Sequence, residues 1–354
     1  GPVDERRWPM LALAWCPHAF VYDNLNQQWH EVHWRGHEAT IDLPPDLHAP
    51  QSQSLRIGAL TSGMSPDTYL HTVQRALDYI AAGDIFQANI TQRLSASFAG
   101  STRLLACRAL AESEAWYGAY LEFPNGRTAT SLSPELFVRV DGENGHASGS
   151  ARHVITRPIK GTRPGDADPD ELARSEKDAA ELHMIMDLMR NDLGRVCEYG
   201  SVRVPHGRVI ESHPTVHHGV GEVHGTLREE VSFTDLLRAT FPGGSVTGAP
   251  KIRAMQIIEE LETVRRGPYC GAIGYISSCG RSQLNIAIRT IGLTGERPGD
   301  RWDHMTGVLD YGTGGGIVAD SIPAEEMREC QDKAEVLRRV MRVGQSLNVS
   351  STRL

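Results

Sequence analysis

The sequence predicts an α+β protein in which antiparallel sheets are covered on the outside by helices. Three observations support this fold class. Segments with the pattern of strands dominate the middle of the chain, predicted helices are interspersed among them without strict alternation, and 40% of the 354 residues are hydrophobic. Regular alternation of strand and helix would indicate a parallel sheet instead. A chain of this length and composition can bury a large core.

The first predicted element is a β-hairpin over residues 9–34, where apolar and polar residues alternate on either side of Asn24 and Asn26. Residues 41–64 contain three prolines and a run of Gln and Ser, which is typical of an exposed connection.

A helix is expected to begin at Ser65, because serine is a favoured N-cap and proline follows it at the first helical position. It should end at Gly83. Its apolar stripe has helical spacing and consists of Tyr69, Val73, Leu77 and Ile80. Strand patterns follow at 85–94, 116–123 and 135–140, and the polar stretch 141–153 is expected to form a loose hairpin tip.

The second half mixes both element types. A long helix is predicted from the capping residues at Asp168 to about Leu193, since an acid stands three positions after the cap. Further helices are expected over 233–240, 250–262 and 323–343. Strands are expected over 270–278, 283–291 and 304–310.

Charge and cysteine content exclude several classes of protein. The net charge is −8 with a pI near 6.0 and no long basic run, which argues against nucleic-acid or membrane-surface binding. Six scattered cysteines without a CxxC pair indicate neither a zinc site nor a disulfide framework, so a cytoplasmic protein is expected. No apolar run approaches the roughly 20 residues that span a bilayer.

Acidic residues on two predicted helices form a candidate metal site. Glu326 and Glu329 lie one turn apart, and Glu181 lies at the edge of the buried face of an earlier helix. Carboxylate oxygens are the ligands that Mg²⁺ prefers. The alternative is an ordinary surface ion pair between Glu329 and Lys333 at i, i+4.

Two further segments have features of a site. The run Gly312 to Gly316 lacks the lysine and the following helix of a phosphate-binding P-loop, and could form either an anion-binding turn or a tight hairpin turn. Lys160 stands between an apolar residue and a glycine. Desolvated there it could be neutral and nucleophilic, whereas a solvated strand-end lysine is the plainer interpretation.

These segments together resemble the chorismate-utilising enzyme family, which includes anthranilate, aminodeoxychorismate, isochorismate and salicylate synthases. The resemblance is densest from residue 65 to 340. Its markers are 83–89 (GDIFQAN), 133–135 (SPE), 181–185 (ELHMI), 190–194 (RNDLG), 241–251 (FPGGSVTGAPK) and 314–321 (GGGIVADS). It implies two large, mainly antiparallel sheets packed as a sandwich with helices outside.

The resemblance also implies roles for individual residues. Glu181, Glu326 and Glu329 would hold Mg²⁺, which would neutralise the ring carboxylate of chorismate. Substrate-binding positions would be Gln87, Gly161, Thr162, Ser245, Tyr269, Arg289, Gly314, Gly316 and Lys333. Tyr269 and Arg289 would hold the enolpyruvyl carboxylate. Catalytic positions would be Lys160, Glu135 and His218, although the Gly219-Val220-Gly221 that follows His218 differs from the Leu-Val-Ser usual in the family.

Two positions select a branch of the family. Water-adding members carry a lysine where this chain has Gln87, and anthranilate synthases carry alanine where it has Lys160. The resemblance therefore implies amination of chorismate at C4 to 4-amino-4-deoxychorismate, on the route to 4-aminobenzoate and folate. Lys160 would attack C2, Glu135 would protonate the leaving hydroxyl, and ammonia would displace the lysine.

The resemblance also implies a division of the chain and a partner. Residues 1–64 would be the remnant of a longer N-terminal region, 65–345 the catalytic domain and 346–354 a tail. Because no glutaminase chemistry is visible, ammonia would come from a glutamine amidotransferase subunit. The alternatives are an anthranilate synthase component I, or a truncated, inactive chorismate-binding homologue.

Overall fold

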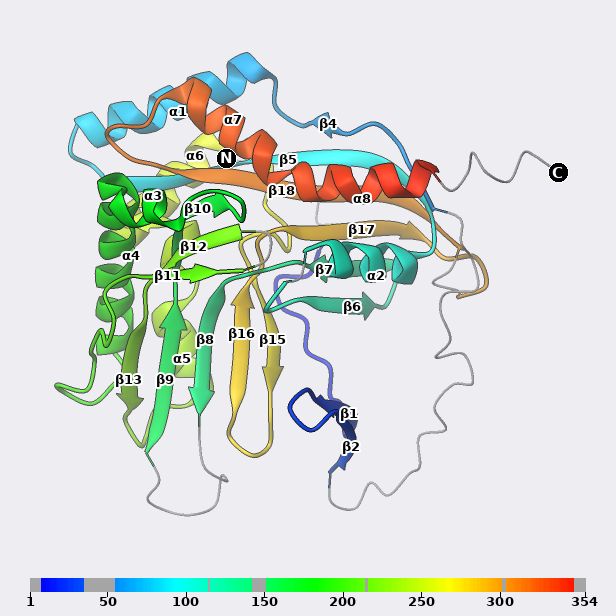
Figure 1. Ribbon diagram of the computed structural model, residues 1–354, viewed down its shortest axis with the longest axis horizontal. Helices are drawn as coiled ribbons and strands as arrows, with labels where there is room; N and C mark the ends of the chain where they lie inside the picture. Colours follow the sequence, from blue (N-terminus) through cyan, green and yellow to red (C-terminus); the bar gives the residue numbers. More distant parts are fainter. Residues whose placement is uncertain are drawn as a thin grey trace.

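The computed structural model describes residues 8–34, 55–113, 115–141, 151–213, 216–300 and 304–346. Its strands form two large antiparallel sheets and two small ones (Figure 1). None of the described helices is long and apolar enough to cross a bilayer. The α+β fold with antiparallel sheets and outer helices is therefore confirmed.

The larger sheet has eight strands. Six follow the order β14 (Gly248–Ala249), β5 (Gln87–Gly100), β18 (Met305–Ile317), β17 (Thr290–Glu296), β7 (Arg127–Ser131) and β6 (Ala119–Phe123). The short strands β3 (Leu55–Ile57) and β4 (Thr61–Ser62) also pair with β5. Residues 55–64 are therefore partly strand and not a connection throughout, because β3 and β4 pair with the second half of β5, whereas residues 41–54 of the expected connection lie outside the described residues.

The second sheet has five strands in the order β13 (Val223–Leu227), β9 (Arg152–Arg157), β8 (Leu136–Asp141), β16 (Ser282–Ile286) and β15 (Ala272–Ile276). Its strands run across those of the larger sheet in Figure 1. A small sheet of β10 (Ile159–Pro164), β12 (Val216–Val220) and β11 (Val209–Ser212) lies where the two large sheets meet.

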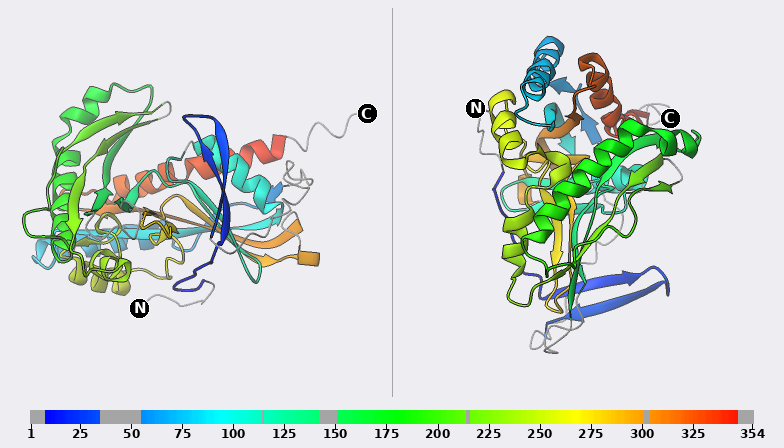
Figure 2. Two further views of the ribbon diagram at one scale, coloured as in Figure 1. Left: turned by 90° about the horizontal axis from the view of Figure 1, so that it is seen from below. Right: turned by 90° about the vertical axis from the view of Figure 1, so that its left-hand side faces the viewer.

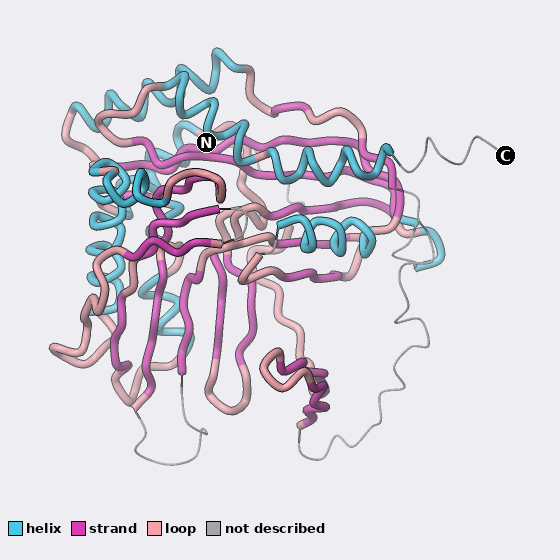
Figure 3. The backbone as a smooth tube through the Cα atoms, in the orientation of Figure 1, coloured by secondary structure: helices cyan, strands magenta, loops and turns pink. Residues whose placement is uncertain are grey.

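Helices cover the outer faces of both sheets (Figure 3). α2 (Thr102–Ser113) and α8 (Glu335–Ser346) pack on the eight-stranded sheet around Phe98, Leu105 and Leu337. α1 (Pro66–Ala81), α6 (Lys251–Leu261) and α7 (Pro323–Lys333) surround the end of β5 and β18 that carries Ala88 and Ile317. α4 (Glu176–Gly194) and α5 (Phe233–Thr240) cover β9 and β13.

The predicted N-terminal hairpin is confirmed as β1 (His18–Asp23) paired with β2 (Gln28–His33). Figure 2 shows it standing away from the two large sheets. Helix α1 begins after the Ser65 cap, whose side chain accepts the Thr68 N–H, and it ends before Gly83. Residues 142–150, most of the expected hairpin tip, lie outside the described residues, as does 347–354 in the expected tail.

Four predictions of element boundaries are wrong. The helix expected over 168–193 is divided into α3 (Pro169–Arg174) and α4, because Ser175 has an extended backbone and caps α4 through the Asp178 N–H. The last helix divides into α7 and α8 at the fully buried Ala334. The strand expected over 283–291 becomes β16 and β17, separated where Arg289 has φ +49°. Residues 312–316 are strand, and not a turn, because they pair with 89–93 of β5.

Candidate active site

Lys160 lies on strand β10 at a β-bulge. Ile159 pairs with Val220 and Thr162 pairs with His218, so Lys160 and Gly161 together face the single residue Gly219. Gly161 has φ +78°, a conformation that favours glycine, and a side chain there would collide with Leu172 and Asp178. The bulge therefore interrupts the regular alternation of β10 at the lysine.

The amine of Lys160 points to the end of the eight-stranded sheet. Its Nζ lies 3.4 Å from the place that a β-carbon on Gly316 would take, and the Gln87 amide fills the space beside it. Gln87 is fully buried, and neither Oε1 nor Nε2 has a hydrogen-bond partner in the part of the chain that the structure describes. Buried amides are normally paired, so this amide is positioned to bind a ligand.

Glu135 approaches the same place from the start of β8. It is 3% exposed, and burial raises the pKa of its carboxyl to about 7, against the opposing effects of the Ser245 hydroxyl, Lys160 and Lys333 nearby. Oε1 of Glu135 has no hydrogen-bond partner among the described residues. A carboxyl group with this pKa can donate a proton near neutral pH.

The three candidate metal ligands come from two helices. Burial raises the pKa of both Glu181 on α4 and Glu326 on α7, and Ser321 donates a hydrogen bond of 2.7 Å to Glu326. Glu329 carries a negative charge close enough to raise the pKa of both. All three are oxygen donors suited to Mg²⁺. Across the described ranges, however, no three acidic, histidine or cysteine side chains are gathered closely enough to hold a metal ion.

Lysines neutralise part of this acidic group. Lys333 Nζ lies 2.6 Å from Glu329 Oε1 and donates to the Gly314 carbonyl at 2.7 Å. Desolvation alone would raise the pKa of Glu329, but the Lys333 ammonium lowers it. The ion pair expected as the plain alternative at i, i+4 therefore exists, and it lies against the glycine strand beside Lys160.

His218 and Arg289 border a cavity of about 140 Å³ that is also lined by Ile159, the residue before Lys160. His218 is 3% exposed, its Nδ1 lies 3.0 Å from Thr162 Oγ1, and burial together with the nearby charge of Arg289 lowers its pKa to about 3. His218 is therefore neutral at physiological pH and can form hydrogen bonds without adding charge.

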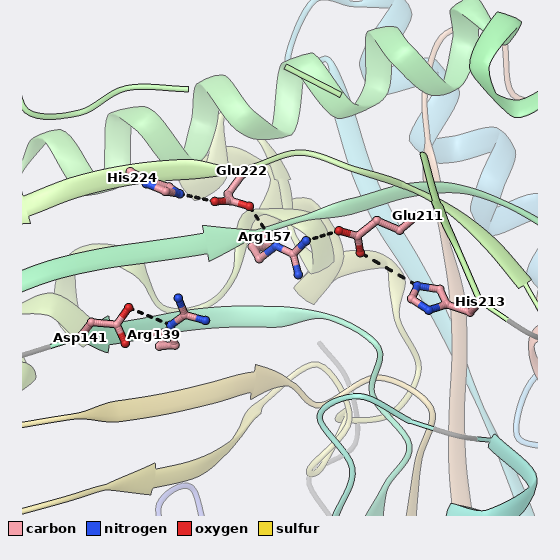
Figure 4. A network of polar contacts seen from close by, with 7 residues as sticks. All are labelled: Arg139, Asp141, Arg157, Glu211, His213, Glu222 and His224. Carbon is pink, nitrogen blue, oxygen red and sulfur yellow. Dashed lines mark hydrogen bonds and ion pairs between the residues drawn. The ribbon is translucent and has the colours of Figure 1, made fainter. Parts of the chain in front are cut away.

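A polar network holds the strand before Lys160. Arg157, three residues earlier at the end of β9, bonds both Glu211 on β11 and Glu222 before β13 (Figure 4). Glu222 in turn bonds His224. The network ties the five-stranded sheet to the small sheet that carries Lys160.

Residues 2–339 match the family of chorismate binding enzymes. The chain belongs to this family. It is 39% identical over 333 residues to aminodeoxychorismate synthase component 1 of Salmonella typhimurium, covering 92% of this chain and 69% of that protein. It is also 40% identical over 289 residues to anthranilate synthase component 1 of Thermus thermophilus, covering 80% of this chain and 58% of that protein.

The fold is shared with a solved member of the family. The crystal structure of anthranilate synthase component I from Streptococcus pneumoniae superposes with a TM-score of 0.74 at 32% identity. The match covers 89% of this chain and 71% of the solved chain. The family and the fold predicted by resemblance are therefore confirmed.

The residues predicted from the family resemblance do not all meet in one cavity. Tyr269 is buried, packs against Gly312, and lines a smaller cavity with Thr290 and Tyr311. Arg289 lines the larger cavity with His218 instead. The turn at Arg289 places consecutive residues on different cavities, so the structure does not bring Tyr269 and Arg289 together in a single pocket.

Lys177 is a charged residue of the site that the sequence reasoning missed. It lies on α4 one turn before Glu181, and its charge lowers the pKa of Glu181, Glu326 and Glu329. Its i, i+4 spacing from Glu181 was a signal in the sequence. The effect of the Lys177 charge on the two acids of α7 depends on how α4 and α7 pack, which the spacing does not predict.

Proposed function

We propose that this chain aminates chorismate at C4 to give 4-amino-4-deoxychorismate. The observation that carries the proposal is the placement of the Lys160 amine beside the unpaired amide of Gln87, the side-chain-free backbone of Gly316, and the acids Glu135, Glu181 and Glu329. A nucleophile, a proton donor and an anion-binding region are thereby within reach of one small molecule. The name of the Salmonella relative supports the same product.

The proposed reaction has two displacements. The lone pair of Lys160 Nζ forms a bond to C2 of chorismate, the two conjugated ring double bonds shift toward C4, and the C4–O bond breaks. Glu135 gives its proton to the departing hydroxyl, which leaves as water. Ammonia then bonds to C4, both double bonds shift back, and the C2–Nζ bond breaks, which returns the lysine. The ammonium formed at C4 gives one proton to the Glu135 carboxylate, which restores the acid.

The remaining residues bind and orient the substrate. Arg289 offers a planar, two-pronged donor for a carboxylate, whereas Arg157 and Arg339, which line the same cavity, already pair with carboxylates of the protein. The neutral His218 supplies a hydrogen-bonding ring beside it. The amide of Gln87 cannot remove a proton from water as a basic side chain could, so a nucleophile at this place would have to be reactive without a base, as ammonia is.

Glu181, Glu326 and Glu329 would hold Mg²⁺, which when bound would neutralise the ring carboxylate of chorismate. All three provide the oxygen ligands that a hard cation prefers. Among the described residues no three such side chains are gathered closely enough to hold a metal ion, so binding of Mg²⁺ would have to draw the three acids together. The ammonia donor is proposed to be a glutamine amidotransferase partner, in keeping with the "component 1" in the relatives' names.

A product assay tests the proposal. The protein is incubated with chorismate, ammonium and Mg²⁺, and the products are separated with and without an added lyase that removes pyruvate. We expect 4-amino-4-deoxychorismate, and 4-aminobenzoate only when the lyase is present. The similar identity to an anthranilate synthase component favours a second candidate. Fluorescent anthranilate and free pyruvate formed without the lyase would identify that activity and reject ours.

The covalent step has its own test. Lys160→Ala should reduce amination severely while chorismate still protects the protein against heat. Unchanged turnover in this variant would remove the nucleophilic role. A folded wild-type protein that does not bind chorismate with Mg²⁺ would point instead to an inactive homologue.

A further inference from the structure

Gly219 lies directly behind Lys160 on the neighbouring strand β12. It is the single residue that faces the bulge of Lys160 and Gly161. A β-carbon built on Gly219 would lie 2.5 Å from the backbone carbonyl oxygen of Lys160, closer than real β-carbons approach such an atom. The absence of a side chain at 219 therefore permits the close approach of β12 to the lysine's own peptide group.

The backbone conformation of Gly219 does not itself require glycine. Its φ is not among the positive values found at glycines such as Gly161 and Gly200. An alanine could adopt the same backbone angles, so the only effect of the added methyl would be steric. Because the atom it meets belongs to the backbone of Lys160, the strain cannot be relieved by rotating a side chain.

Arg208 also lies close to the place where a side chain of Gly219 would stand. Its guanidinium donates to the carbonyl oxygens of Leu172 and of Ser175, the latter at 3.1 Å, at the junction of α3 and α4. Its Nε lies 3.2 Å from the position of the same added β-carbon. Lys160 and Arg208 thus both lie within 3.2 Å of the place where a β-carbon of Gly219 would stand.

We propose that Gly219 is a positioning residue for Lys160, with Arg208 supporting it from behind. The close packing at 219 fixes the bulge, and the bulge aims the amine at Gln87 and Gly316. This inference rests on the proposed role of Lys160 as nucleophile.

The test compares Gly219→Ala with Gly194→Ala, whose added β-carbon would meet no atom within 4 Å. Displacing a nucleophile by about 1 Å can cost on the order of a hundredfold in rate. We expect Gly219→Ala to lower kcat by about that factor and to leave KM for chorismate within about twofold, since Arg289 and the acids are undisturbed. Gly194→Ala should behave like the wild type.

A double variant separates positioning from general damage. In a Lys160→Ala background, Gly219→Ala should cause no further loss of residual activity, because its effect acts through the lysine. Wild-type turnover of Gly219→Ala, or a further loss in the Lys160→Ala background, would overturn the inference. If Lys160→Ala is inactive while Gly219→Ala is fully active, only the inference fails. If Lys160→Ala is itself active, the proposed nucleophile and the inference fall together.

A second variant applies if Gly219→Ala does not fold, as judged by circular dichroism. Arg208→Gln removes the guanidinium behind Gly219 without adding volume to the strand. It should give the same pattern in milder form, a lower kcat with KM retained and no added effect in the Lys160→Ala background. An unchanged kcat in folded Arg208→Gln would overturn the proposed support from Arg208 and, without a folded Gly219→Ala, the inference as a whole.

Discussion

Lys160 Nζ lies 3.4 Å from the position that a β-carbon on Gly316 would occupy. The two residues lie on strands of different sheets, β10 and β18, and Gly316 places no side chain beside the Lys160 amine and the buried amide of Gln87. A strand of glycines thus forms one wall of the site. The Lys160 amine can approach this strand closely because Gly316 has no side chain.

Gly316→Ala should therefore disable the site. The methyl group would collide with the Gln87 amide and touch the Lys160 amine, so we expect kcat/KM for amination to fall at least about tenfold. Steady-state rates with ammonium give the measurement, and Gly194→Ala is the matched control. Normal kinetics in a folded Gly316→Ala would show that substrate does not lie between these residues.

Glu135 should control the alkaline limb of the pH profile. Its pKa is raised to about 7 by burial, and the proposed acid must be protonated, so its contribution to kcat/KM should decline as pH rises through about 7. Glu135→Gln should be slow at all pH values and should lack this decline. Profiles of both proteins between pH 6 and 9 test this, and an identical alkaline limb in the variant would exclude Glu135 as the acid.

His218 should make the fold less stable in acid. Its folded-state pKa of about 3 lies below the usual 6.5, so the unfolded chain binds the proton more tightly. Its contribution to stability is complete above pH 6.5 and is lost as pH falls toward 3. His218→Gln should reduce this loss, which urea unfolding at pH 7.5 and pH 5 can measure. An equal loss in both proteins would show that other groups cause it.

Glu326 should be required for the response to Mg²⁺, while its neighbour Glu325 should not. Glu326 belongs to the acids of the site and is only 4% exposed, whereas Glu325 faces solvent and pairs with Arg328. We expect chelation to abolish amination, added Mg²⁺ to restore it, and Glu326→Gln to need at least about tenfold more Mg²⁺. Glu325→Gln should match the wild type. Full activity of the wild type in chelator would contradict a metal requirement.

Local structure was largely predictable where neighbouring residues specify it. The start of α1 follows from the Ser65 hydroxyl and the proline after it, and the β1–β2 hairpin follows from alternation around Asn24 and Asn26. The breaks within longer elements were not predictable. Ser175 is compatible with a helix interior, and whether it caps α4 depends on contacts with distant strands: α3 and α4 both contact β10 and β12, whereas α3 also packs on β11 and α4 also packs on β13 and β14.

The features of the candidate site were likewise predictable only in part. Residue type and spacing indicated a lysine on a strand and acids one helical turn apart, and the family resemblance supplied their roles. The approach of Lys160 to Gln87 and Gly316, which lie 73 residues before it and 156 after it, could not be read from spacing. The steric conflict that a side chain at Gly219 would cause could not be predicted either, because it involves the carbonyl oxygen of Lys160 on another strand.

The sequence alone determined the α+β fold class, the family and the chemical types of residue available for catalysis, because periodicity, capping and motifs are local properties of the chain. Only the tertiary structure decided which of them meet. The pKa of Glu135, the neutrality of His218 and the bulge at Lys160 all depend on burial and strand pairing between distant segments. Desolvation and close packing are consequences of the assembled fold, so no single segment encodes them.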